Sequence, residues 1–166
     1  VVVSLCSIPE RTKILKIALE SLAPQVDEIN VYLDRYTEIP DFVKKCHKNV
    51  NVVLSKDVPG LRDNGKFLPF NSIEKECYYF TADDDILYPP DYISAMVRKI
   101  DYYKRMAVVG VHGVLIPDRP SGYFSGFRRV YHFKQELGQD ALVSNLGTGT
   151  VGFYSGSLKG LNYQEF

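Results

Sequence analysis

The sequence lacks a net charge, a cysteine framework and any long apolar run. Among its 166 residues, 20 lysines and arginines balance 20 aspartates and glutamates, so no basic surplus points to nucleic acid as the main partner. No apolar stretch approaches the roughly 20 residues that a membrane-spanning helix needs. With 45% hydrophobic and 24% charged residues, the composition is that of an ordinary globular protein. A site for an anionic ligand would have to be built locally, from a few side chains or a metal ion.

The three cysteines are Cys6, Cys46 and Cys77. Their number is odd, and their spacing matches neither a disulfide framework nor a zinc pattern. Cys6 and Cys77 lie in apolar, strand-like runs, so we expect them to be reduced core residues. Free thiols suit a reducing compartment, which predicts a cytoplasmic location. Any association with a membrane would come from segments outside this sequence.

The sequence starts inside an apolar run, residues 1–5, and stops in mid-pattern at residues 162–166. We therefore expect residues 1–166 to form a single domain that is a piece of a longer protein. The chain is long enough to bury a substantial core.

Strand-like and helix-like segments alternate through residues 1–116. Short apolar runs predict five strands, at residues 1–5, 29–33, 50–54, 77–81 and 107–116. Apolar residues at helical spacing predict helices at residues 12–22 and 41–48, and a third that carries Pro90 in its first turn. Between them, residues 58–65 are loop-like and residues 66–74 open as a helix.

This alternation predicts an α/β fold with three layers around a mainly parallel sheet. The composition changes after residue 116. Glycine and aromatic residues dominate residues 122–133, and threonine, valine and glycine dominate residues 142–154. We expect a smaller antiparallel part there, packed beside the main sheet.

Three consecutive carboxylates, Asp83, Asp84 and Asp85, follow the fourth predicted strand. Ligands of open α/β sheets bind at the carboxyl ends of strands, and alternation along a strand would turn Asp83 and Asp85 to one side. A hard divalent cation with oxygen ligands would offset their mutual repulsion. A solvated turn or a helix N-cap is the alternative explanation. The apolar residues on both sides favour a metal site.

The segment around this cluster, residues 79–93 with the letters YFTADDDILYPPDYI, resembles the Asp-x-Asp segment of GT-A-fold glycosyltransferases, especially those of family 2. The opening strand, Asp34 after the second strand, and a glycine-containing stretch before the acidic strand occur in the same order as in that family. The resemblance covers roughly residues 1–155. It implies a GT-A-like, Rossmann-like fold, with residues 1–116 as the nucleotide-sugar-binding half and residues 117–166 as the start of the acceptor-side half.

The resemblance also implies a nucleotide-diphosphate sugar, such as a UDP-sugar, as donor and Mn²⁺ or Mg²⁺ as cofactor. Asp85 matches the last aspartate of the motif and Asp83 the first, which makes both candidate metal ligands, with Asp83 also able to face the ribose. Counting back from Pro89 against the commoner Asp-x-Asp-Asp form instead puts Ala82 and Asp84 in these positions. Asp84 is therefore a further nucleotide-sugar-binding candidate.

Three other positions match the nucleotide end of the family's site. Asp34 matches the aspartate that accepts a hydrogen bond from the base, although a strand-end turn residue explains it equally well. Pro9 and Arg11 match the loop that lines the nucleotide. Arg11 could pair with a phosphate, or could be a surface charge at a helix start.

Two further segments carry candidates. Arg62, Asp63 and Lys66 match the stretch that folds over the donor, and Lys66 is the favoured contact to the diphosphate or the base. The segment Gly147, Thr148, Gly149 resembles the part that lines the donor sugar and the acceptor, where glycine lets a sugar approach the backbone. The letters also fit a dinucleotide fingerprint, but that motif belongs between the first strand and a helix, so we reject this interpretation.

An inverting transferase needs a general base for the acceptor hydroxyl. In the family this is an acidic residue well downstream of the metal motif. Asp140, Glu136 and Glu165 are the candidates within the sequence, and we expect the base to lie beyond Phe166.

We therefore expect a hexosyl- or N-acetylhexosaminyltransferase that moves a sugar to the hydroxyl of a polysaccharide, a glycolipid or a protein, with inversion. A nucleotidyltransferase that makes an activated sugar is one alternative, but residues 7–11 lack the glycine-rich phosphate loop that it needs straight after the first strand. A non-catalytic sugar- or nucleotide-binding module is the other, because no base is identified.

Overall fold

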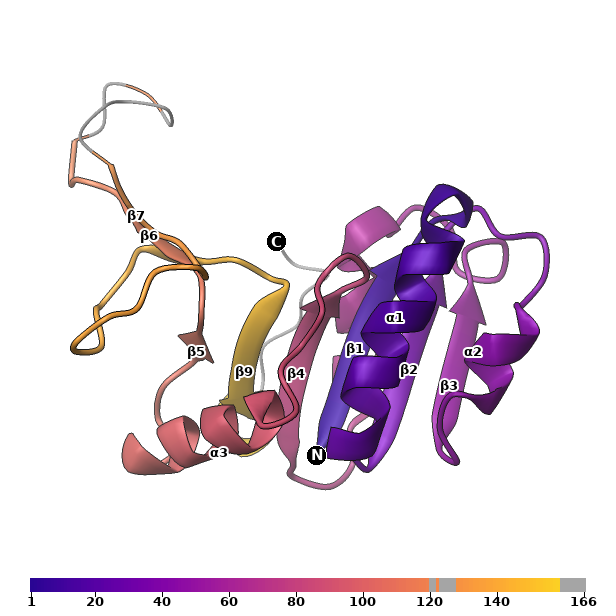
Figure 1. The fold of residues 1–166 in the computed structure, drawn as a ribbon, viewed down its shortest axis with the longest axis horizontal. Helices are drawn as coiled ribbons and strands as arrows, with labels where there is room; N and C mark the ends of the chain where they lie inside the picture. The colour runs from indigo at the N-terminus through magenta and orange to yellow at the C-terminus, as the bar shows by residue number, and fades with distance from the viewer. Residues whose placement is uncertain (120–121, 123–127, 159–166) are drawn as a thin grey trace.

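The computed structural model describes residues 1–119, 122 and 128–158. Its centre is a six-stranded sheet in the order β3-β2-β1-β4-β9-β5 (Figure 1). The strands β1 (Val2–Ser7), β2 (Glu28–Leu33), β3 (Val50–Leu54) and β4 (Tyr78–Asp83) run parallel. The strand β9 (Thr150–Tyr154) pairs antiparallel with β4 and with β5 (Val109–Gly110). The predicted α/β fold with a mostly parallel sheet is thus confirmed.

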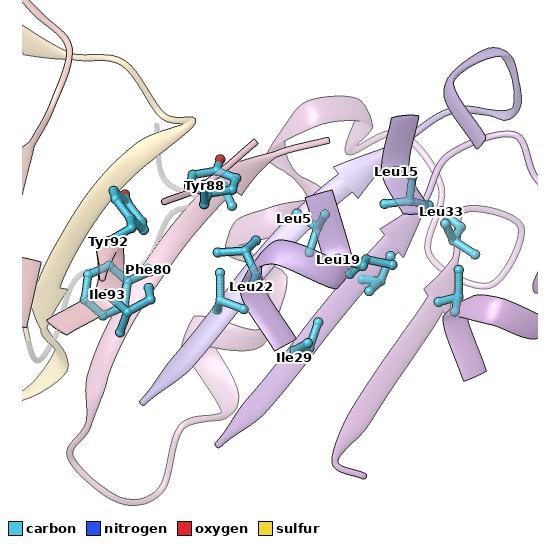
Figure 2. Close-up of a cluster of buried hydrophobic side chains, with 14 of the residues drawn as sticks. Leu5, Leu15, Leu19, Leu22, Ile29, Leu33, Phe80, Tyr88, Tyr92 and Ile93 are labelled. Carbon is cyan, nitrogen blue, oxygen red and sulfur yellow. The ribbon is translucent and has the colours of Figure 1, made fainter. Parts of the chain in front are cut away.

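Three α-helices cover one face of this sheet (Figure 1). They are α1 (Thr12–Leu22), α2 (Asp41–Lys45) and α3 (Tyr92–Tyr102). In α1 the buried positions Leu15, Ala18, Leu19 and Leu22 follow the 3–4 residue spacing that predicts this helix, and the observed bounds equal the predicted ones. Their side chains pack on alternate residues of the strands, as Figure 2 shows for Leu5 and Ile29.

The second face carries a run of 3-10 turns, η3 (Arg62–Ser72), in place of an α-helix. The predicted helix at residues 66–74 is therefore wrong in type, and the predicted loop at 58–65 overlaps the start of this run. Pro69 lies inside η3 and has no backbone N–H for a helical ladder, which favours the short turns. Phe70 packs edge-on against Tyr79 and Phe153, so η3 forms the third layer.

The single strand predicted at residues 107–116 is divided into two short strands, because the chain changes sheets within it. Residues Val109 and Gly110 join the main sheet as β5, whereas β6 (Gly113–Leu115) pairs with β7 (Arg129–Tyr131) and β8 (Asn145–Leu146) in a separate antiparallel sheet. An added Cβ at Gly110 would meet Leu146, and one at Gly113 would meet Val143. Close backbone approach at these glycines lets two sheets meet on either side of a two-residue bend.

Two helix boundaries also differ from prediction. The helix α2 ends at Lys45, three residues early, and Cys46 caps it. The helix α3 starts after Asp91, so Pro90 precedes the helix and does not belong to its first turn. Within the described ranges, no helix has the length and apolar character needed to cross a membrane.

Candidate functional site

A cleft lies at the carboxyl ends of the central strands. The chain continues from β1 to β2 on one side and later returns to β4 on the other, so β1 and β4 form the switch point where ligands of open α/β sheets bind. The cleft has a volume of about 640 Å³, within the range of small-molecule sites. Its lining consists of Cys6, Ser7, Ile8, Arg11, Asp34, Arg35, Arg62, Asp63, Asp83, Asp84 and Asp85.

The three consecutive aspartates lie at the end of β4. The strand ends at Asp83, and a turn carries Asp84 and Asp85. The side chain of Asp84 is 4% exposed, against 37% for Asp83 and 44% for Asp85. The burial alternates, but all three side chains line the same cleft, so Asp84 does not face the opposite side as the strand pattern predicted.

Arg11 binds two of these aspartates. It precedes α1, and its Nη1 atom lies 2.9 Å from Oδ1 of Asp84 and 3.0 Å from Oδ2 of Asp85. The hydrogen bond that the Arg11 guanidinium donates to Asp84, together with the charges of the acidic turn, raises the pKa of Arg11. The predicted site residue Arg11 thus lies in the cleft, where it neutralises the nearly buried carboxylate of Asp84.

Lys66 neutralises the remaining aspartate from beneath the cleft. It belongs to η3, its side chain is fully buried, and its Nζ atom lies 2.5 Å from Oδ1 of Asp83 and 3.1 Å from Oδ1 of Asp63. Burial opposes the charge on Lys66, but the hydrogen bonds and charges of Asp83 and Asp63 outweigh it, so the pKa of Lys66 is raised. Lys66 therefore carries a charged ammonium group at neutral pH.

The loop before β9 closes one side of the acidic turn. The hydroxyl of Thr81 donates to the carbonyl oxygen of Thr148 at 2.6 Å, and Oγ1 of Thr148 lies 3.5 Å from Nζ of Lys66. The Cα of Gly149 lies so close to Asp83 that an added Cβ would overlap its Oδ2 atom. The backbone of residues 147–149 therefore forms a wall beside the first aspartate, while Gly147 itself packs on the ring of His112.

Sequence reasoning missed the residue that holds this wall in place. Tyr88 is 3% exposed, and its hydroxyl accepts a hydrogen bond from the backbone N–H of Asp83 at 2.8 Å. The same hydroxyl donates to the carbonyl oxygen of Gly149 at 2.6 Å. Its position five residues after Asp83 is visible in the sequence, but the partner loop lies 61 residues further on and only the fold identifies it.

At its opposite end the cleft is bounded by the loops after β1 and β2. Asp34 lines this end, and its backbone N–H donates to Ser7 at 2.9 Å. Arg35, which sequence reasoning missed, forms two hydrogen bonds of 3.0 and 2.9 Å with the carboxylate of Glu10. Since Glu10 follows β1 and Arg35 follows β2, this ion pair ties the two loops together.

Arg62 lines the cleft with an exposed side chain, and no charged partner is found for it among the described residues. Its backbone has a φ of 50°, in the left-handed region that non-glycine residues rarely adopt. The thiol of Cys6 donates to the carbonyl oxygen of Arg62 at 3.2 Å, and burial and the charge of Asp63 raise the pKa of Cys6 to about 12. Cys6 is therefore a protonated thiol that supports the cleft.

The other predicted site residues lie elsewhere. Pro9 begins the short η1 turn (Pro9–Arg11), and its carbonyl oxygen accepts a hydrogen bond from Thr12, outside the cleft lining.

Of the candidates for the general base, Asp140 binds Lys99 at 2.9 Å and Tyr103 at 2.6 Å next to α3. Glu136 is exposed and is not part of the lining. Glu165 lies outside the described residues.

The carboxylates suit a divalent cation in chemistry, although they are not gathered into a closed metal cage. Within residues 1–119, 122 and 128–158, no group of three or more His, Cys, Asp or Glu side chains has the arrangement of a metal site. Mg²⁺-type sites commonly use one or two carboxylates together with substrate phosphates and water. Asp83 and Asp85 are partly exposed oxygen donors on the same cleft, so they fit such a two-carboxylate site.

The charge balance of the cleft also favours a bound divalent cation. Five aspartates line it against three arginines, and Lys66 adds one cation from below. One of the arginines, Arg35, is already neutralised by Glu10. Acidic groups therefore remain in excess, and an anionic ligand would need an additional cation to enter.

No protein-family model matches the sequence, and no curated protein matches it either. The chemistry of the cleft must therefore be judged from its own residues.

Proposed function

We propose that this chain is the nucleotide-sugar-binding half of a metal-dependent glycosyltransferase with a GT-A-like fold. The observation that carries the proposal is the cleft at the β1/β4 switch point, where aspartates and unneutralised arginine share one lining. Carboxylates supply ligands for Mn²⁺ or Mg²⁺, and arginines supply donors for phosphate. A nucleotide-diphosphate sugar, here a UDP-sugar, has the charge and size that such a cleft accommodates.

In this proposal each residue of the cleft has a defined task. Asp83 and Asp85 hold the cation, which acts as a Lewis acid on the diphosphate when bound. Lys66 fixes the carboxylate of Asp83, and Tyr88 fixes the backbone that carries it. Arg11 and Arg62 face the cleft as donors for the phosphate oxygens.

The two ends of the cleft serve different parts of the donor. Asp34 at the β2 end accepts from the base, because its carboxylate has no side-chain partner among the described residues. The wall at residues 147–149 lies next to the cleft lining and faces the sugar, since its backbone packs directly against Asp83. The sugar then passes to a hydroxyl of a polysaccharide, a glycolipid or a protein, with inversion as in the family that the sequence resembles.

One observation keeps a non-catalytic binding module as a second candidate. A general base should lie at the cleft, yet the candidate Asp140 is bound to Lys99 and Tyr103 beside α3. If the base lies beyond Phe166, the chain binds the donor and requires that further part for turnover. A binding module would bind the same donor and show no turnover in any longer form of the protein.

Calorimetric titration with UDP-, GDP-, CMP- and TDP-sugars, each with and without Mn²⁺, tests the proposal. We expect a UDP-sugar to bind in the presence of Mn²⁺ and to bind at least tenfold more weakly without it, since the acidic excess then repels the diphosphate. Asp85→Ala should remove the effect of Mn²⁺. Asp57→Ala, an exposed aspartate outside the cleft, is the matched control and should leave binding unchanged. Absence of binding by all donors, or an unchanged Asp85→Ala, contradicts the proposal.

A further inference from the structure

The acidic turn has two counter-ions, and they differ in their freedom to leave. Lys66 is fully buried and holds Asp83, whereas the side chain of Arg11 is 46% exposed and holds Asp84 and Asp85. The contact distances of the two pairs are similarly short. The pairs differ in the exposure of the cationic side chain to water.

Lys66 is a permanent counter-ion. Its ammonium lies between Asp63, Asp83 and Thr148 beneath the cleft, and its backbone carbonyl accepts from the hydroxyl of Tyr79 at 2.8 Å. Separating this fully buried ammonium from its carboxylates would leave the lysine charge without a partner and without water around it. We therefore treat the pair of Lys66 and Asp83 as fixed during ligand binding.

Arg11 can move. It precedes the first turn of α1, and the only side chains that bind its guanidinium within the described part of the chain are Asp84 and Asp85. The contact with Asp85 joins two partly exposed side chains, 46% and 44% exposed, and such a pair is worth little because water replaces the contact. The same Nη1 atom occupies the space beside Oδ2 of Asp85, where the proposed function requires a divalent cation.

We propose that Arg11 is a displaceable counter-ion that couples the cation to the diphosphate, an inference that rests on the proposed function. Without ligand, Arg11 neutralises Asp84 and Asp85. When a divalent cation takes Asp85, the guanidinium gives up that carboxylate, keeps its hydrogen bond to Asp84 and donates its other N–H groups to the diphosphate. The diphosphate thus gives Arg11 a new partner, and each ligand strengthens the binding of the other by more than their direct contact provides.

This exchange has an unusual consequence for the cation alone. Because Arg11 competes with the cation for Asp85, its removal should tighten Mn²⁺ binding in the absence of nucleotide, by roughly tenfold at low salt for two contacts near 3 Å. A residue that only shapes the cleft would leave Mn²⁺ affinity unchanged or would weaken it. Removal should also weaken UDP binding, since a phosphate donor is lost.

The test is Mn²⁺ titration followed by electron paramagnetic resonance, with and without saturating UDP, on wild type, Arg11→Gln and Arg11→Ala. Glutamine can still donate to the nearly buried Asp84, so it protects the fold if the alanine variant is unstable, and thermal unfolding checks both. Lys13→Gln removes a nearby exposed charge that contacts neither aspartate and should behave as wild type. We expect tighter Mn²⁺ binding without UDP and a smaller gain of Mn²⁺ affinity on adding UDP in both Arg11 variants.

The outcomes separate the two proposals. Unchanged or weaker Mn²⁺ binding by the Arg11 variants, while wild type binds UDP with Mn²⁺, overturns the counter-ion role and leaves the proposed function standing. Absence of Mn²⁺ and UDP binding in wild type overturns both. A gain of affinity that Lys13→Gln shares overturns the exchange as well, because it then reflects overall charge.

Discussion

The Nζ atom of Lys66 lies 2.5 Å from Oδ1 of Asp83, and the lysine side chain is fully buried while the aspartate faces the cleft. A charged group inside the protein thus fixes a carboxylate at its surface. The arrangement is stable because Asp63 shares the same ammonium at 3.1 Å. Replacing Lys66 therefore tests how much this ion pair contributes to the free energy of unfolding.

Lys66→Met should lower the free energy of unfolding by about 1–3 kcal/mol at pH 7, less than for a fully buried pair because both aspartates reach water. The pKa of Lys66 is raised above its usual 10.5 in the folded state, so its contribution is complete below pH 10.5 and is lost as pH rises through the folded-state value. The difference between wild type and variant should be constant from pH 6 to 9 and shrink at higher pH. Urea unfolding from pH 6 to above pH 10.5 measures it, and a difference that does not shrink above pH 10.5 contradicts the argument.

Tyr88 and Tyr92 allow a matched comparison. Their rings lie 4.9 Å apart, and burial raises the pKa of both hydroxyls. Tyr88 bonds to Asp83 and Gly149, whereas the buried hydroxyl of Tyr92 has no partner among the described residues. Tyr88→Phe should cost about 1–3 kcal/mol, because it leaves two backbone groups unsatisfied.

Tyr92→Phe should be neutral or slightly stabilising, because it removes a polar atom that gains nothing in the core. Denaturant unfolding of both variants checks the pair. Equal losses of stability would show that ring packing, rather than the hydroxyl of Tyr88, holds the acidic turn to the β9 loop.

The central sheet was predictable because its strands depend on local patterns. The apolar run at residues 50–54 and the helical spacing at 12–22 carry their own signals, and both elements have the predicted bounds. The segment at 107–116 has an equally apolar run, but Gly110 and Gly113 take it into two sheets through contacts with residues 30 or more positions away. No local pattern contains that information.

The candidate site likewise contains residues that were recognisable from the sequence and contacts that only the fold identifies. Asp83 to Asp85 were recognisable because three charges follow a buried strand. Their partners were not, since Arg11 and Lys66 reach them across 73 and 17 positions through the geometry of the sheet. The sequence therefore indicated which residues are candidates for the site, and the fold was needed to pair them.

Gly149→Ala tests the wall beside the acidic turn. An added Cβ would overlap Oδ2 of Asp83, and that carboxylate is held from the other side by Lys66. Asp83 must therefore turn or the loop must retreat, and we expect Mn²⁺ affinity in the presence of UDP to fall roughly tenfold, as for misplacement of one ligand. Gly138→Ala, where an added Cβ meets nothing within 4 Å, is the control. Equal affinities of the two variants would remove Gly149 from the site.

A comparison of Arg62 with Lys104 distinguishes the effect of backbone strain on stability from an effect on ligand binding. Both have a left-handed backbone, with φ of 50° and 55°, but Arg62 lines the cleft while Lys104 follows α3 far from the acidic turn in sequence. Replacing either by glycine removes a strain of about 1–2 kcal/mol and adds an entropic cost of about 0.5–1 kcal/mol. Each variant should therefore gain roughly 0.5 kcal/mol of stability.

The affinity for UDP should distinguish the Arg62→Gly variant from the Lys104→Gly variant. Arg62→Gly should weaken UDP affinity several-fold in the presence of Mn²⁺, with a smaller loss at high salt, because an exposed cation in the cleft is screened. Lys104→Gly should bind UDP as wild type does. Thermal unfolding and calorimetry on the same samples measure both properties. If Arg62→Gly gains stability and keeps its affinity, the strained backbone of Arg62 has no role in nucleotide binding, and the phosphate contact must come from Arg11 alone.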